Sequence, residues 1–193
     1  MHVNYEEFSQ DSIWYHTKLP SVIVDEIEKE VSDVSLQDAK VFGDANSLVD
    51  NKLRSSQVSF IPGTSWVSAF CYYYVKRANA MNFKYDITDF YSGDCLQYTV
   101  YNEGQFYNWH VDSLGFEHGL VRKLSFSLQL SDENDYEGGD LQLLNTVGNS
   151  SYFIPKERGT IIIFDSHIKH RVKKIRSGTR KSIVGWVLGP KLR

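Results

Sequence analysis

The stretch of sequence with the clearest chemical potential ends in a histidine and a carboxylate separated by one residue. It reads YNEGQFYNWHVD (101–112), and the pair is His110 and Asp112. Residues two apart on a β-strand project from the same face, so this imidazole and this carboxylate would lie side by side. They offer two ligands to one metal ion. A second histidine would complete the set that holds Fe(II) in non-haem oxygenases and leaves coordination positions open.

Two histidines farther along the chain could supply the third ligand. His167 lies in a predicted turn after the apolar run 160–164, and His170 opens the next predicted strand. A histidine at the start of a strand, at the rim of a barrel, is well placed to meet a ligand pair on another strand. We therefore favour His170, and His167 remains the alternative.

An arginine ten residues after His170 adds a second chemical feature. Strand periodicity places Arg180 and Ser182 on one face. A guanidinium beside a hydroxyl suits a carboxylate, which it can hold through two charge-assisted hydrogen bonds. The plain alternative is that Arg180 is a surface charge after the turn at 177–179.

The elements that would position these residues are short strands. In one of them, Leu124, Phe126 and Leu128 alternate with Ser125 and Ser127, which predicts one apolar face and one small or polar face. Seven or eight short strands after a helical N-terminal part indicate a mainly β fold with α, a two-sheet β-barrel or jelly roll buttressed by N-terminal helices. The predicted strands from residue 96 onward are 96–101, 107–112, 123–130, 140–144, 160–164, 170–175 and 181–188.

Two helices are predicted before this region. The spacing of Ile23, Ile27 and Val31 is typical of an amphipathic helix, for which Ser21 would be the N-cap. Ser65 would cap a second helix that runs to about residue 80.

The rest of the N-terminal half predicts little regular structure. Residues 43–57 are polar and would form a connector, followed by a short strand at 57–61. We expect one domain over residues 1–193, in which 1–95 form the helical buttress and edge strands and 96–190 form the β core.

Composition narrows the classes of partner. Hydrophobic residues make up 41% of the chain, charged residues 23%, and the net charge is −3. These values give no reason to expect a nucleic-acid or membrane surface. No secretory signal and no apolar run long enough to span a bilayer are visible, and the two cysteines are scattered, so we expect a cytoplasmic protein with reduced thiols. The oligomeric state is not indicated.

At this point the sequence resembles a known family, the Fe(II)- and 2-oxoglutarate-dependent dioxygenases, and within it the prolyl 4-hydroxylase-like group. The resemblance covers about residues 96–188. It implies a double-stranded β-helix, the jelly roll typical of that family. Three segments carry it: YNEGQFYNWHVD (101–112), RKLSFSLQLSDENDYEGGDLQL (122–143) and GTIIIFDSHIKHRVKKIRSGTRKSIVGW (159–186).

The resemblance also implies roles for individual residues. His110, Asp112 and His170 would bind Fe(II) and form the catalytic centre. Co-substrate binding would fall to Arg180, which would pair with the far carboxylate of 2-oxoglutarate. Tyr101 and Ser182 would assist Arg180, and Trp186 would line the site. Collagen-type members carry lysine where this chain has Arg180, which weakens any expectation of a collagen-like substrate.

The activity implied is hydroxylation of a protein or peptide side chain, with proline favoured. Fe(II), 2-oxoglutarate and O2 would be required, and ascorbate would serve as reductant. The iron and the keto acid would carry the chemistry while the protein supplies geometry. Alternatives are hydroxylation of a free amino acid or another small molecule, a non-catalytic module that senses iron or 2-oxoglutarate, and a metal hydrolase with the same three ligands.

Overall fold

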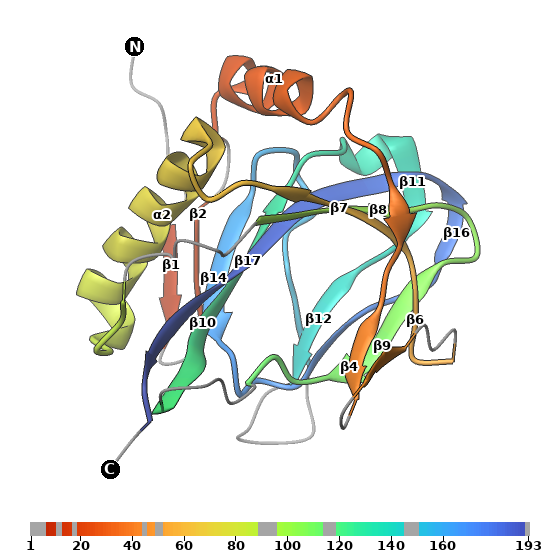
Figure 1. Cartoon of the computed structure of the whole chain (residues 1–193). Coiled ribbons are helices and arrows are strands. Elements are labelled where there is room, and N and C mark those ends of the chain that lie inside the picture. The colour runs from red at the N-terminus through yellow and green to blue at the C-terminus, as the bar shows by residue number, and fades with distance from the viewer. Residues whose placement is uncertain are drawn as a thin grey trace.

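The protein consists of two facing antiparallel sheets, with two helices against the outer side of the larger one (Figure 1). The computed structural model describes residues 7–10, 13–16, 19–43, 46–48, 52–88, 96–113, 119–144 and 151–191. Their strands, helices and facing sheets confirm the predicted fold class, a mainly β jelly roll with α-helices.

The larger sheet has eight strands and the smaller has five. In spatial order, the larger contains β1 (Glu7–Gln10), β2 (Ile13–His16), β14 (Ile161–Asp165), β10 (Leu120–Gln129), β17 (Arg180–Pro190), β8 (Leu96–Tyr101), β7 (Gln57–Ile61) and β3 (Gln37–Asp38). The smaller contains β13 (Ser151–Phe153), β12 (Leu141–Leu144), β15 (His170–Val172), β9 (Phe106–His110) and β6 (Arg54–Ser55). Two further antiparallel pairs are β11 (Tyr136–Gly138) with β16 (Ile175–Gly178), and β4 (Val41–Gly43) with β5 (Asn46–Leu48).

The alternation predicted for β10 separates the two faces of the larger sheet. Leu124 and Leu128 lie in the apolar cluster that packs against the helices, whereas Ser125, Ser127 and Gln129 are buried on the opposite face. Adjacent strands follow the same rule. The residues of β8, β14 and β17 that face the helices belong to the same apolar cluster: Leu96, Tyr98, Val100, Ile161, Ile163, Ile183 and Val187.

The helices α1 (Ser21–Glu30) and α2 (Trp66–Ala78) cover this apolar face. Ser65 caps α2 as predicted, since its hydroxyl accepts a hydrogen bond from the backbone N–H of Val67 at 3.2 Å. Cys71 of α2 is fully buried with a free thiol, and burial raises its pKa to about 12. The helix continues as a π-helical turn at Asn79–Phe83.

Several local predictions were wrong. Ser21 is the first residue of α1 and not its cap, because Pro20 occupies the cap position without a side-chain hydrogen bond. The stretch 43–57 is not a plain connector, since it includes β5 and β6. The predicted strand 170–175 is divided between β15 and β16. These segments are too short for sequence periodicity to resolve.

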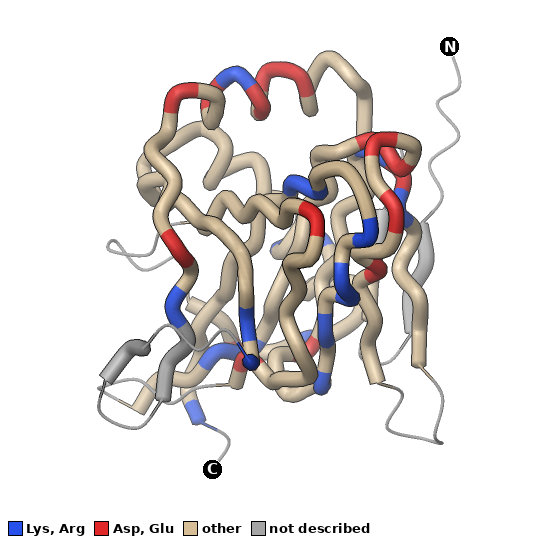
Figure 2. Tube along the Cα trace, turned by 90° about the vertical axis from the view of Figure 1, so that its right-hand side faces the viewer, with Lys and Arg blue, Asp and Glu red and all other residues tan. Residues whose placement is uncertain are grey.

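Charges of both signs are interspersed along the chain in the view of Figure 2, in keeping with the small net charge. Among the described residues, no helix combines the length and the hydrophobicity needed to cross a bilayer.

Candidate functional site

Two strands of the smaller sheet bring the predicted histidines face to face. β9 and β15 pair antiparallel, with His110 directly opposite His170. His110 Nε2 lies 3.6 Å from Asp112 Oδ1, and His170 Nε2 lies 3.4 Å from Asp112 Oδ2. One ligand atom from each residue lies within 4.8 Å of the others. No other histidine, cysteine or carboxylate group in the described part of the chain has such an arrangement.

An irregularity in β9 shapes the wall beside this cluster. His110 pairs with His170 but Tyr107 pairs with Val172, so β9 contains one more residue than β15 over this span. A bulge of this kind turns side chains three residues apart toward the same face. The Tyr107 ring consequently stacks on the His110 imidazole, with centroids 3.5 Å apart and planes inclined by 10°.

Asp112 reaches the cluster by a route that the sequence did not predict. β9 ends at His110, and Asp112 lies beyond the strand. Its backbone N–H donates to Ser166 O at 3.0 Å, and that of Ser113 donates to the same carbonyl at 2.9 Å. The Ser125 hydroxyl donates to Asp112 Oδ2 at 2.8 Å and lies 2.9 Å from Ser166 Oγ. Contacts to β10 and to the turn after β14 therefore fix Asp112 and its carboxylate.

Backbone carbonyls set the orientation of both imidazoles. Nδ1 of His110 lies 2.7 Å from Asn108 O, and Nδ1 of His170 lies 3.0 Å from Ile168 O. Because a carbonyl can only accept, each Nδ1 carries the proton and each Nε2 keeps its lone pair toward Asp112. This pattern is typical of histidines that bind metal ions.

The protonation states of these residues at neutral pH also suit metal binding. Burial, followed by the proximity of His170, lowers the pKa of His110 to about 3. Burial alone would raise the pKa of Asp112, but His170, His110 and the indole N–H of Trp186 hold it below its usual range. Neutral imidazole at His110 and an ionised carboxylate at Asp112, beside a second imidazole, form the donor set that fits Fe(II).

The cluster opens into a cavity of about 620 Å³ between the two sheets. All seven residues that the sequence associated with the site line it: Tyr101, His110, Asp112, His170, Arg180, Ser182 and Trp186.

Arg180 is not a surface charge. It is 4% exposed and lies opposite Tyr101 in the pairing of β17 with β8. Its Nη1 donates to Ser182 Oγ at 3.2 Å, and its Cζ is 5.8 Å from the centre of the Tyr101 ring. Among the described residues, no carboxylate forms an ion pair with Arg180. A buried guanidinium without a described carboxylate partner is suited to an anionic ligand.

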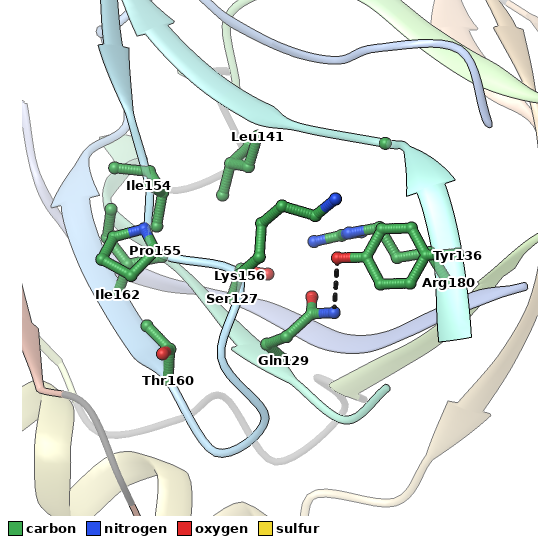
Figure 3. Close-up of a pocket in the computed structure, with 11 residues that line it drawn as sticks. Ser127, Gln129, Tyr136, Leu141, Ile154, Pro155, Lys156, Thr160, Ile162 and Arg180 are labelled. Atoms are coloured by element: carbon green, nitrogen blue, oxygen red, sulfur yellow. Dashed lines mark hydrogen bonds between the residues drawn. The ribbon is translucent and has the colours of Figure 1, made fainter. Parts of the chain in front are cut away.

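Polar residues that the sequence reasoning missed gather around this guanidinium (Figure 3). Gln129 Nε2 donates to the Tyr136 hydroxyl at 3.0 Å, and Lys156 Nζ lies 4.3 Å from the centre of the Tyr136 ring. These side chains and Arg180 line a small void of about 10 Å³, which is room for roughly one water molecule. The polar face of β10 was a usable signal for Gln129.

A glycine allows the turn after Tyr136 to approach Arg180. Gly139 has φ +62°, and a Cβ there would lie 2.4 Å from Ile175 Cδ1 and 3.2 Å from Arg180 Cδ. Glycine is therefore favoured at this position, because this φ is strained for other residues and a Cβ would force the Ile175 side chain to shift.

His167, the alternative third ligand, lies outside the cluster. Its Nδ1 is 2.9 Å from Asp165 Oδ1, its Nε2 is 2.9 Å from Ser113 Oγ, and its side chain is 61% exposed. It links the turn after β14 to the segment that follows Asp112.

Comparisons with known proteins agree with this geometry. The family model described as "2OG-Fe(II) oxygenase superfamily" matches residues 96–188. A PKHD-type hydroxylase of Synechococcus sp. (strain CC9902) is 44% identical over 84 residues, which is 44% of this chain and 36% of the relative. A PKHD-type hydroxylase of Idiomarina loihiensis is 34% identical over 87 residues, covering 45% and 38% of the two chains. The matches thus span less than half of either protein.

Solved structures show the same fold over nearly the whole chain. A Pseudomonas putida prolyl-4-hydroxylase has a TM-score of 0.66 at 18% identity and covers 97% of this chain and 93% of its own. A Trichoplax adhaerens prolyl hydroxylase, in complex with a hypoxia inducible factor peptide fragment, has a TM-score of 0.71 at 20% identity, covering 93% and 84%. The matched family model and the PKHD-type relatives confirm the resemblance seen in the sequence, a similarity of residues 96–188 to the 2OG-Fe(II) oxygenase superfamily, and the solved structures confirm the fold.

Proposed function

We propose that the protein is an Fe(II)- and 2-oxoglutarate-dependent dioxygenase that hydroxylates a protein or peptide side chain, with proline as the favoured target. One observation carries the proposal. The cluster of His110, Asp112 and His170 shares a cavity with Arg180, which has no described carboxylate partner. The matched superfamily model, the PKHD-type relatives and the peptide complex of a protein with the same fold support it.

The metal cluster has a defined part in this proposal. Nε2 of His110, Nε2 of His170 and the Asp112 carboxylate would hold the Fe(II) ion. When bound, Fe(II) supplies the activation of O2, with 2-oxoglutarate oxidised to succinate and CO2 while one oxygen atom enters the substrate C–H bond. Backbone carbonyls and Ser125 keep the three ligands oriented before the metal arrives.

Residues of the larger sheet would position the co-substrate. Arg180 would hold the far carboxylate of 2-oxoglutarate through two parallel hydrogen bonds from its guanidinium. Ser182, whose hydroxyl accepts a hydrogen bond from Arg180, would fix the orientation of the guanidinium. Tyr101 lies opposite Arg180 and would contribute its hydroxyl. Trp186 would close the side near Asp112 and restrict water. Ascorbate would keep the metal in its ferrous state.

Two wider expectations also belong to the proposal. Residues 1–193 would act as one domain, since α1 and α2 pack on strands of the β core. The location would be cytoplasmic.

A second candidate is hydroxylation of a free amino acid or another small molecule. The cavity of about 620 Å³ favours it, because sites for small ligands commonly measure roughly 300–1,000 Å³.

The proposal is tested by incubating the purified protein with Fe(II), 2-oxoglutarate, ascorbate and panels of proline-containing peptides and free amino acids. Succinate should form only when Fe(II) and 2-oxoglutarate are both present, and mass spectrometry should find one added oxygen atom in a substrate. Succinate formation that persists with a chelator, or oxygen addition without 2-oxoglutarate, would contradict the proposal. Identification of the oxidised molecule also decides between the peptide and the free amino acid.

A further inference from the structure

A second buried guanidinium lines the cavity on the sheet that carries the histidines. Arg54 belongs to β6, the edge strand next to β9, and is 6% exposed. It pairs in register with Tyr107, and its Cζ lies 4.7 Å from the centre of the Tyr107 ring. The same ring stacks on His110. Arg54 is thus separated from the metal cluster by a single aromatic side chain.

Arg54 lacks a counter-ion within the described residues. Its Nε donates to Ser56 Oγ at 2.8 Å, and no described carboxylate forms an ion pair with it. A buried cation costs free energy unless an opposite charge or good hydrogen bonds compensate it. The Nε contact uses one of the five N–H donors of the guanidinium. Arg180, on the opposite sheet, is in the same situation, and the proposed function gives it an anionic ligand.

The charge of the cavity wall points the same way. Among its described lining residues, four are cationic and two are acidic: Lys40, Arg54, Arg122 and Arg180 against Asp38 and Asp112. Asp112 belongs to the metal cluster. After one anion is assigned to Arg180, cationic groups remain in excess, and an excess of one sign in a cavity concentrates ligands of the other.

Two of these cations lie over aromatic rings that line the cavity, and Arg54 lies over Tyr107. Arg122 stacks on the Trp186 ring, with its Cζ 3.9 Å from the centre. Aromatic rings of the cavity wall therefore contact both Arg54 and Arg122.

We infer that Arg54 forms a second anion-binding subsite, which receives a carboxylate of the molecule to be hydroxylated. The inference rests on the proposed function and specifies its substrate class. The carboxylate belongs either to a free amino acid or to an acidic side chain of a peptide, placed so that a neighbouring C–H bond faces the metal cluster. A planar guanidinium can bind such a group through two parallel hydrogen bonds.

A purely structural role for the stacking is the alternative, and the same sheet supplies a matched control. Arg171 of β15 stacks on Trp109 of β9, with its Cζ 4.6 Å from the ring centre, and its Nε donates to Gln142 Oε1 at 2.7 Å. Unlike Arg54, it does not line the cavity. Substitution of Arg171 therefore removes an arginine–aromatic stack without touching the subsite.

The test measures ligand binding by calorimetry on the whole chain, under anaerobic conditions with Fe(II) and 2-oxoglutarate. The probes are two matched pairs, L-proline with L-prolinamide, and acetyl-Pro-Glu-amide with acetyl-Pro-Gln-amide. In at least one pair the carboxylate should bind about tenfold or more tightly than the amide. The free energy of a hydrogen bond to a charged group corresponds to an affinity difference of about that size. Arg54→Gln should abolish the preference, and Arg171→Gln should retain it. The pair that responds identifies the source of the carboxylate.

Two results would overturn the inference: no preference for the carboxylate in either pair, or a preference that survives in Arg54→Gln. If Arg54→Gln does not fold, Arg54→Lys keeps the charge but loses the planar fork, and the preference should then fall severalfold while amide binding is unchanged. An unaltered preference in Arg54→Lys would count equally against the subsite. Admission of O2 to the same samples separates the two proposals. Absence of succinate refutes the dioxygenase, whereas succinate without a carboxylate preference refutes only the subsite.

Discussion

The two faces of β10, in the larger sheet, are almost equally buried but chemically opposite. On the helix side, Leu124 and Leu128 of β10 are fully enclosed among apolar neighbours. On the cavity side of the same strand, Ser125, Ser127 and Gln129 are 2%, 7% and 5% exposed. Burying polar groups is unfavourable unless they are hydrogen-bonded, so they are retained where they have a task.

This difference distinguishes the face that stabilises the fold from the face that forms the candidate site. The helix side can be treated as a close-packed core, where volume and shape set the free energy of unfolding. The cavity side holds its polar side chains through specific partners, among them Asp112 for Ser125 and Tyr136 for Gln129. Substitutions on the two faces should therefore fail in different ways.

The largest effect is expected from removal of a metal ligand. Asp112→Ala or His110→Ala should lower 2-oxoglutarate turnover by roughly a thousandfold or more, because an incomplete ligand set no longer holds Fe(II) for O2 activation. The thermal unfolding midpoint should change little. Succinate release and circular dichroism measure both quantities. Full turnover in either folded variant would exclude that residue from the ligand set.

A truncation on the helix side should damage stability instead. Leu128→Ala should reduce the free energy of unfolding by about 2–5 kcal/mol, since it leaves a cavity in a packed apolar cluster. Ser127→Ala, one residue away on the other face, should change it by less than about 1 kcal/mol. Urea unfolding of the two variants measures both values. Equal losses would mean that the two faces do not differ as described.

Removal of the buried guanidinium of Arg180 should affect the co-substrate selectively. Arg180→Ala should raise the 2-oxoglutarate concentration needed for half-maximal turnover by about 10- to 100-fold, which corresponds to the loss of charge-assisted hydrogen bonds. Arg176→Ala removes an arginine of β16 that lies 3.6 Å from Glu137, and it should leave this concentration unchanged. Initial rates at varied 2-oxoglutarate decide the matter, and an unaltered requirement in Arg180→Ala would assign the carboxylate to another residue.

A smaller effect is expected from the hydroxyl behind the metal cluster. Ser125→Ala should weaken Fe(II) binding by about tenfold, because partners that orient a ligand typically contribute 10- to 100-fold to metal affinity. Ser127→Ala removes a hydroxyl from the same face of β10 without touching Asp112 and should bind Fe(II) like the natural protein. Anaerobic metal titration compares them. Identical affinities would show that Ser125 has no part in orienting the carboxylate.

The sequence predicted the features that depend on period and composition. The alternation in β10, the strands β7 and β8 and the capping of α2 by Ser65 all followed from local patterns. Features created by contacts between distant segments could not be predicted from local patterns. The bulge that turns Tyr107 toward His110 depends on the register of β9 against β15, which no single strand encodes.

The candidate site likewise has residues that the sequence predicted and residues that it did not. His110, Asp112, His170 and Arg180 could be named from their spacing and from the family resemblance, but the path by which Asp112 reaches the histidines could not. It relies on the Ser166 carbonyl rather than on strand periodicity. Arg54 was also beyond the reach of the sequence, since its segment gave no strand signal and only its pairing with β9 places it in the cavity.

The ligand set itself is tested most directly by the stoichiometry of Fe(II) binding in anaerobic equilibrium dialysis. The natural protein and His167→Ala should each bind one Fe(II) ion per chain, and Asp112→Ala and His170→Ala should bind none at the same metal concentration. Loss of binding in His167→Ala, or retained stoichiometric binding in His170→Ala, would contradict the metal centre described above.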